Sequence, residues 1–117
     1  MRILLIINDA PYGTEKAYNA LRLAMALQRE HAEVQVSVFL MADAVTCALP
    51  NQTTPNGYYN VERMLAAVIA KGGEVKACGT CIQARGLSQV PLVAGVEVST
   101  MSQLAQWVVD ADRVVTF

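Results

Sequence analysis

The feature that most constrains this fold is the alternation of short apolar runs with helix-like segments. Residues 2–8, RILLIIN, form an almost unbroken apolar run without polar–apolar alternation. Such a run is typical of a parallel strand that is covered on both faces. Four further strand-like segments follow along the chain: 33–40, 74–78, 95–99 and 112–117. With the run over 2–8, they predict a sheet of five strands.

Helix-like segments separate these runs. Residues 15–30 carry an apolar stripe, with Thr14 as a plausible N-cap, and Thr100 with Gln103 forms a capping box before a last helix over 101–111. Two more helical segments are predicted over 41–49 and 58–73. Strands that alternate with helices favour a parallel sheet with helices on both sides. We therefore expect an α/β fold, a three-layer α/β/α sandwich with a five-stranded parallel sheet, in a single domain over 1–117.

Composition narrows the possible partners. The formal net charge is -1, which gives no electrostatic reason to bind nucleic acid or an acidic membrane surface. Charged residues make up 16% of the chain, against about 25% in average proteins. The first helix has apolar side chains beyond the stripe that would face a sheet: Tyr18, Leu23, Met25 and Ala26. These observations predict that apolar surface is buried against further copies of the chain.

No targeting or membrane segment is apparent, because the first apolar run is too short for a signal peptide or a membrane span. We therefore expect a cytoplasmic protein. Three cysteines in such a chain argue against a structural disulfide framework and point to thiol chemistry or packing.

Two of the cysteines, Cys78 and Cys81, form a CxxC motif directly after the strand over 74–78. Ligand chemistry in open parallel sheets gathers beyond the carboxyl ends of the strands, where Cys78 would lie. A thiol between a strand and a short helix favours the thiolate form, and Lys76 and Arg85 could add positive potential. Cys81 could resolve an oxidised Cys78. Packing is the alternative, since free cysteine is often buried.

Other residues are expected near the same end of the sheet. The turn after the first strand offers pocket candidates, as does the segment after the second strand: Asn8, Asp9, Tyr12, Thr14 and Cys47. Each of these could equally serve as an ordinary turn, cap or core residue.

The sequence contains few of the residues that a metal site, a nucleotide cofactor site or a hydrolase triad would need. A structural zinc site needs four ligands, whereas the chain offers Cys78, Cys81 and Cys47. The turn NDAPYGT matches neither the P-loop nor the dinucleotide fingerprint. His31, the one histidine, should lie at the amino end of the sheet, which leaves a Ser-His-Asp hydrolase without a base. We expect no metal and no cofactor.

The chain resembles the DsrE/DsrF-like family, most closely its YchN-type branch. The resemblance spans nearly the whole length and rests on five segments: NDAPYGTEKAYNALRLA, FLMADAV, GYYNVERML, CGTCIQARG and LAQWVVDADRVVTF. It implies a small protein that assembles into rings or cages, commonly hexamers. In the sulfur-relay members a cysteine in this region carries sulfur as a persulfide between partner proteins, and Cys78 aligns with that position.

Taken together, the sequence predicts a small oligomeric sulfur carrier with a persulfide on Cys78, and possible sulfur-donor and sulfur-acceptor proteins as partners. Whether it acts as a sulfurtransferase enzyme stays open. Two alternatives remain. One is a dithiol–disulfide redox protein that uses Cys78 and Cys81. The other is a non-catalytic oligomeric module that binds a small ligand or partner between subunits, with four large side chains as contacts and the thiols inert: Tyr58, Tyr59, Met64 and Trp107.

Overall fold

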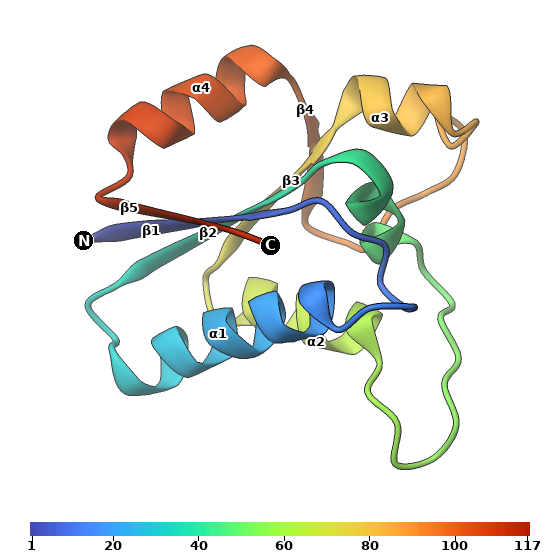
Figure 1. The fold of residues 1–117 in the computed structure, drawn as a ribbon, viewed down its shortest axis with the longest axis horizontal. Coiled ribbons are helices and arrows are strands. Elements are labelled where there is room, and N and C mark those ends of the chain that lie inside the picture. Colours follow the sequence, from blue (N-terminus) through green and yellow to red (C-terminus); the bar gives the residue numbers. More distant parts are fainter.

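The computed structural model describes residues 1–117 and contains one five-stranded sheet in which every pairing is parallel (Figure 1). The strand order is β4-β3-β2-β1-β5. The strands are β1 (Arg2–Ile7), β2 (Gln35–Leu40), β3 (Glu74–Cys78), β4 (Val96–Ser99) and β5 (Arg113–Thr116). The predicted α/β fold and all five predicted strands are thereby confirmed.

Helices form the outer layers of the sandwich. Figure 1 shows α1 (Lys16–Glu30) and α2 (Val61–Ala70) on one face of the sheet, and α3 (Gly79–Ala84) and α4 (Met101–Asp110) on the other. Leu4 and Leu5 of β1 face opposite sides of the sheet, and both are fully buried. The absence of polar–apolar alternation in this strand therefore reflects cover on both faces, as the sequence predicts.

Several helix ends differ from the sequence prediction. The first helix begins at Lys16, after Glu15, which makes no side-chain cap. The Thr14 hydroxyl accepts a hydrogen bond from the Lys16 amide at 3.3 Å, so Thr14 supports the first turn from one position further out. Residues 42–48 form a 3-10 helix, η1 (Ala42–Ala48), where the sequence predicts a longer helical segment. The next helix starts at Val61, because Asn60 caps it and the tyrosines before it lie in the loop.

The turn between α2 and β3 requires its two glycines. Gly72 has a φ of 91°, in the left-handed region that favours glycine. A Cβ on Gly73 would lie 2.6 Å from Cγ1 of Val68, which no ordinary side chain allows. The predicted end of this helix at the Gly-Gly pair therefore follows from backbone conformation at one residue and close packing at the other.

The register brings the carboxyl ends of the three central strands together. Ile7 pairs with Leu40, and Leu40 pairs with Ala77, so the residues that follow β1, β2 and β3 emerge at one edge of the sheet. His31 lies at the opposite edge, exposed, with its ring 3.7 Å from the Glu33 carboxylate. This placement agrees with the sequence analysis, which assigned His31 to the amino end.

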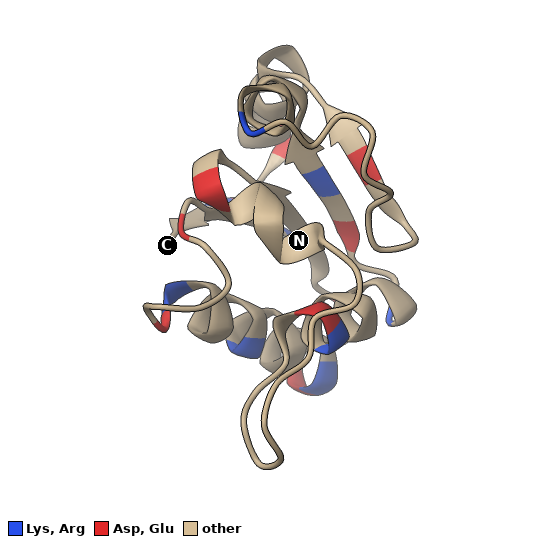
Figure 2. Ribbon diagram, turned by 90° about the vertical axis from the view of Figure 1, so that its right-hand side faces the viewer, with Lys and Arg blue, Asp and Glu red and all other residues tan.

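Charge is spread unevenly over the surface (Figure 2). The long loop between η1 and α2 extends away from the body of the molecule and carries no charged side chain over residues 50–60 (Figures 1 and 2). The helix α4 has one charged residue, Asp110, while its Met101 is 61% and its Val109 is 78% exposed. None of the helices is long and apolar enough to cross a lipid bilayer.

Candidate functional site

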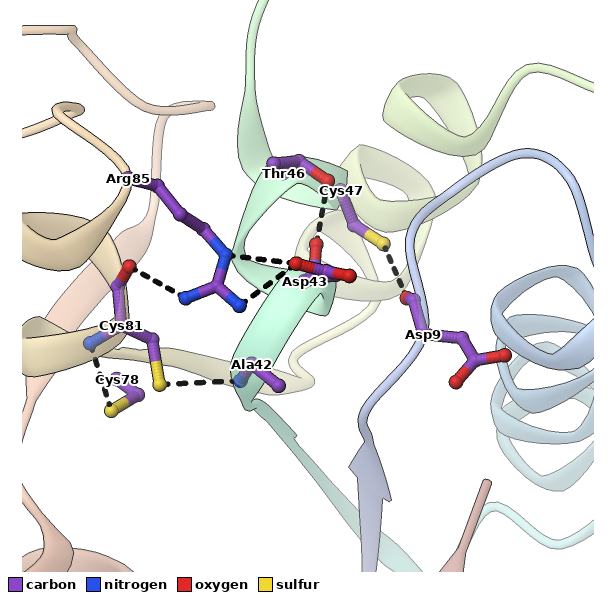
Figure 3. A network of polar contacts seen from close by, with 8 residues as sticks. All are labelled: Asp9, Ala42, Asp43, Thr46, Cys47, Cys78, Cys81 and Arg85. Atoms are coloured by element: carbon purple, nitrogen blue, oxygen red, sulfur yellow. Dashed lines mark hydrogen bonds and ion pairs between the residues drawn. The ribbon is translucent and has the colours of Figure 1, made fainter.

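The two thiols of the CxxC motif lie at the junction of β3 and α3, beside η1 (Figure 3). β3 ends at Cys78, and Gly79 opens the short helix on which Cys81 lies. η1 begins at Ala42, just past the end of β2, the neighbouring strand. The parallel sheet thus brings residues that are about forty positions apart in sequence to the same edge.

Cys78 itself caps the helix that follows it. Its Sγ accepts a hydrogen bond from the Cys81 amide, with the two atoms 3.4 Å apart. The Thr80 hydroxyl lies 3.2 Å from the same sulfur. Since Cys78 is only 5% exposed, these groups replace part of the water that would solvate a thiolate.

The surroundings of Cys78 favour its thiolate. Burial alone would raise the pKa of this thiol, because a charge is costly to bury. Hydrogen bonds from the Cys81 thiol, the Thr80 hydroxyl and the backbone of both residues outweigh burial and hold the pKa of Cys78 below its ordinary value. Hydrogen bonds to the charged form are thus what make this cysteine the more acidic of the pair.

Cys81 has different surroundings. The Ala42 amide donates a hydrogen bond to Cys81 Sγ at 3.2 Å. Ala42 has a φ of 51°, a left-handed conformation that costs a non-glycine residue about 1–2 kcal/mol. Burial, together with the hydrogen bond to Cys78, raises the pKa of Cys81, although the Ala42 amide opposes this shift. Cys81 therefore stays protonated where Cys78 is ionised.

The two basic residues near the motif do not act as the sequence analysis expected. The guanidinium of Arg85 bonds Oδ1 of Asp43 through two nitrogens, at 2.9 and 2.8 Å, and donates to the Cys81 carbonyl at 3.0 Å. Its charge lowers the pKa of Cys81, as the smallest of several influences. Lys76 lies with Nζ 4.9 Å from the centre of the Trp107 ring. Arg85 therefore joins α3 to η1, and hydrogen bonds are what acidify Cys78.

Cys47 lies on η1 and is fully buried. Its thiol is 3.9 Å from the carbonyl oxygen of Asp9, and burial raises the pKa of Cys47 to about 12. A thiol that remains protonated and out of contact with solvent is a poor nucleophile. Cys47 therefore packs the interior between η1 and the turn after β1, which is the structural alternative that the sequence left open.

The side chains of the turn after β1 make their contacts within the turn, with α1 and α2, and with the loop before α2. The Asn8 side chain donates to the carbonyl of Phe117 at 3.2 Å, and the Asp9 carboxylate accepts from Thr14 at 3.0 Å. The Tyr12 hydroxyl donates to Gln52 at 2.7 Å. These residues have no hydrogen bond to Cys78 or Cys81. η1 lies between the two groups, with Asp9 and Cys47 on one side and Cys81 and Arg85 on the other (Figure 3).

The large side chains considered for ligand or partner binding differ in how exposed they are. Tyr59 stacks on Tyr18 and Tyr58, with ring centres 4.1 and 4.6 Å apart. Trp107 is half-buried, and its ring meets Phe39 of the sheet edge-on, with centres 6.0 Å apart. Tyr58 is exposed, whereas Trp107 helps to attach α4 to the sheet and offers little surface to a partner.

Three residues of the site were not singled out from the sequence. Thr80 stands inside the CxxC motif, and a hydroxyl between two thiols is a signal that could have identified it. Asp43 and Ala42 follow the second strand, and only the register of the sheet reveals that they contact α3. No group of three His, Cys, Asp or Glu side chains is arranged to hold a metal ion.

Comparison with known proteins places the chain in a family. The sequence model of the DsrE/DsrF-like family matches residues 1–117. The chain is 45% identical to the protein YchN of Escherichia coli K12 over 116 residues, which cover 99% of this chain and 98% of that one. It is 43% identical to an uncharacterized protein of Methanopyrus kandleri, over 98% of this chain and 93% of the relative.

Solved structures agree with this result. The crystal structure of YchN from Escherichia coli superposes with a TM-score of 0.93 and covers 99% of this chain and 98% of that one, at 45% identity. A protein of unknown function from Methanobacterium thermoautotrophicum shares the fold at 16% identity, with a TM-score of 0.73 and coverage of 99% and 98%. Because the family model matches the whole chain and YchN is 45% identical to it, the chain belongs to the DsrE/DsrF-like family.

Proposed function

We propose that the protein is a sulfur carrier that holds sulfur as a persulfide on Cys78. The observation that carries this proposal is the Cys78 sulfur at the end of β3, which receives the Cys81 amide and lies beside the Thr80 hydroxyl. A thiolate kept by hydrogen bonds in a mostly buried position is a nucleophile that bulk solvent reaches poorly. Such a position also suits a persulfide, whose terminal sulfur is lost readily to other thiols in solution.

The chemistry needs no cofactor. The Cys78 thiolate attacks the outer sulfur of a donor persulfide, R–S–SH, and forms Cys78–S–SH. The donor leaves as the thiolate R–S⁻, so one sulfur–sulfur bond forms and one breaks. An acceptor thiolate then removes the outer sulfur by the same exchange. The protein would act as a sulfurtransferase between a donor protein and an acceptor protein.

Membership of the family supports this assignment. Its sulfur-relay members carry a persulfide on a cysteine in the region where Cys78 lies, as the resemblance in sequence implies. The relay members typically use one essential cysteine, whereas this chain has Cys81 as well. A dithiol–disulfide redox protein is therefore the second candidate, favoured by the presence of both thiols on one helical turn.

Mass spectrometry after incubation with a cysteine desulfurase and cysteine tests the carrier. Cys81→Ser should gain the mass of one sulfur on Cys78, and Cys78→Ser should gain none. Cys47→Ala serves as the matched control and should retain the wild-type response, because Cys47 is buried away from the site. If Cys81→Ser accepts no sulfur from any persulfide donor, while wild type forms a readily reduced disulfide, the redox candidate replaces the carrier.

The protein is also proposed to act as a homo-oligomer in the cytoplasm, with a hexamer as the expected form. The side chains that widen the apolar arc of α1 line an open groove of about 610 Å³ together with Met64 of α2: Tyr18, Leu23, Met25 and Ala26. Polar side chains of α1 complete the lining: Asn19, Arg22 and Arg29. α4 adds exposed apolar side chains. Surfaces of this kind are typical of contacts between subunits.

A further inference from the structure

Cys81 has surroundings that packing alone does not require. The Ala42 amide points at its sulfur from 3.2 Å, and it does so from a left-handed backbone conformation. Strained backbone of this kind persists where the surrounding structure imposes it, often at functional sites. Arg85 then fixes the helix that carries Cys81 to η1, the segment that carries Ala42, through Asp43. The site therefore provides a hydrogen-bond donor for the second thiol as well as for the first.

We propose that Cys81 discharges the sulfur held on Cys78 as hydrosulfide, leaving a Cys78–Cys81 disulfide. This inference rests on the proposed function, since it begins from the Cys78 persulfide. It assigns to the protein a second outcome for bound sulfur, release as sulfide, in addition to transfer to an acceptor protein. The substrates are persulfides, and the agent that restores the two thiols afterwards is a dithiol reductant.

The step balances without any external oxidant. The Cys81 sulfur attacks Cys78 Sγ, the inner sulfur of Cys78–S–S⁻, and the bond between the inner and outer sulfurs breaks. The outer sulfur leaves with the electron pair and takes the proton of the Cys81 thiol, so that HS⁻ is released. The outer sulfur is reduced, and the two cysteine sulfurs are oxidised to a disulfide.

The geometry suits this attack in two ways. The Cys81 amide lies 3.4 Å from Cys78 Sγ, so the two cysteines are neighbours at the start of α3. Cβ atoms three positions apart on a helical turn lie about 5–6 Å apart and a disulfide needs about 3.5–4.5 Å, so a small backbone movement at this junction allows the bond. The Ala42 amide faces the sulfur on which negative charge develops as the proton leaves Cys81. A preorganised N–H at that position stabilises the developing thiolate, as backbone donors do at other reacting anions.

The test uses cysteine persulfide whose outer sulfur is labelled with ³⁴S. Wild type, Cys81→Ser, Cys78→Ser and Cys47→Ala are loaded, freed of the donor by rapid desalting, and followed without added thiol. Labelled sulfide is measured in solution, and the protein is followed by intact mass. We expect wild type and Cys47→Ala to release labelled sulfide at least about tenfold faster than Cys81→Ser. Their intact mass should fall by the labelled sulfur and two hydrogens, to two hydrogens below the unloaded dithiol protein.

The outcomes separate this inference from the proposed function. If Cys81→Ser holds the labelled sulfur and wild type releases it with disulfide formation, both stand. If wild type keeps its persulfide as long as Cys81→Ser does, Cys81 is not a discharging residue, and the carrier remains. If Cys81→Ser accepts no labelled sulfur on Cys78, the carrier fails, and the discharge step fails with it. Cys78→Ser shows whether Cys81 accepts labelled sulfur when Cys78 is absent.

Discussion

The three cysteines show how strongly the same side chain depends on its neighbours. Burial dominates at Cys47 and raises its pKa to about 12, although a backbone hydrogen bond to the sulfur opposes this shift. Cys78 is nearly as buried, yet hydrogen bonds from Cys81 and Thr80 lower its pKa. Hydrogen bonds to the charged form can outweigh the cost of burying a charge, and at Cys78 they do. Reactivity at this site is therefore a property of the β3–α3 junction as a whole.

Thr80 offers a test of this account at the level of one residue. In Thr80→Val the thiolate loses a hydroxyl donor, so the pKa of Cys78 should rise toward its ordinary value. The thiolate fraction at neutral pH then falls, and alkylation of Cys78 by iodoacetamide at pH 7 should slow several-fold. The measurement is the pH profile of alkylation, with tandem mass spectrometry to distinguish Cys78 from Cys81.

Thr80→Ser is the matched control for this experiment. It retains the hydroxyl and should keep the profile close to that of wild type, whereas Thr80→Val moves it to higher pH. Equal profiles for the two variants would show that the hydroxyl does not set the acidity of Cys78.

At the scale of elements, helix ends illustrate where a local motif and the tertiary structure diverge. The capping box before α4 is half realised, because the Thr100 hydroxyl accepts from the Gln103 amide at 3.2 Å. The Gln103 side chain does not return to the Thr100 amide, and its Oε1 accepts from the hydroxyl of Ser99 instead. Ser99 is buried at the end of β4, beside Cys78 in the sheet, so Gln103 satisfies a polar group there.

Gln103→Ala should therefore cost more than the loss of a surface glutamine. The substitution leaves the Ser99 hydroxyl buried without a partner, which costs about 1–3 kcal/mol of unfolding free energy. Chemical denaturation of wild type, Ser99→Ala, Gln103→Ala and the double variant forms a double-mutant cycle. We expect the double variant to be clearly more stable than the sum of the single losses predicts. Strict additivity would mean that the two side chains are not coupled.

At the scale of the whole molecule, exposed apolar side chains gather on α4, where only one residue is charged. Val109 is 78% and Met101 61% exposed on α4, a helix with one charged residue. Isolated apolar residues on a surface need no explanation, but several on one helix with a single charged residue favour a contact with another subunit. The proposed oligomer would cover this surface.

Val109→Asp tests the contact. We expect wild type to form a stable oligomer at micromolar concentration, and the variant to shift toward the monomer, because an unpaired carboxylate is costly to bury at an interface. Light scattering coupled to size exclusion gives the mass directly. Gln89→Asp, which adds the same charge at an exposed loop position, is the control and should leave the wild-type mass unchanged. A monomeric wild type would remove the oligomer from the proposal.

The sequence by itself determined the elements of this protein, because their signals are local. Continuous apolar runs such as 2–8 mark strands that are covered on both faces, and Thr100 and the Gly72–Gly73 pair mark helix ends through hydrogen bonds or backbone conformation within a few residues. The Asn60 cap, which starts α2 three residues later than the sequence predicts, was not identified in this way. The place of Cys78 at the carboxyl end of its strand also follows from order along the chain. The alternation of strands and helices predicted the α/β/α sandwich, and resemblance to the family added the expected oligomer and the persulfide on Cys78.

Only the tertiary structure decided the strand order, β4-β3-β2-β1-β5, and with it the neighbours of each thiol. The Ala42 amide lies on Cys81, and Asp43 lies on Arg85, because β2 and β3 pair in one register. The burial that raises the pKa of Cys47, and the ion pair that joins Arg85 to Asp43, also depend on the assembled sheet. Contacts between segments about forty residues apart depend on how the whole sheet assembles, and a local sequence pattern does not show which distant residues will meet.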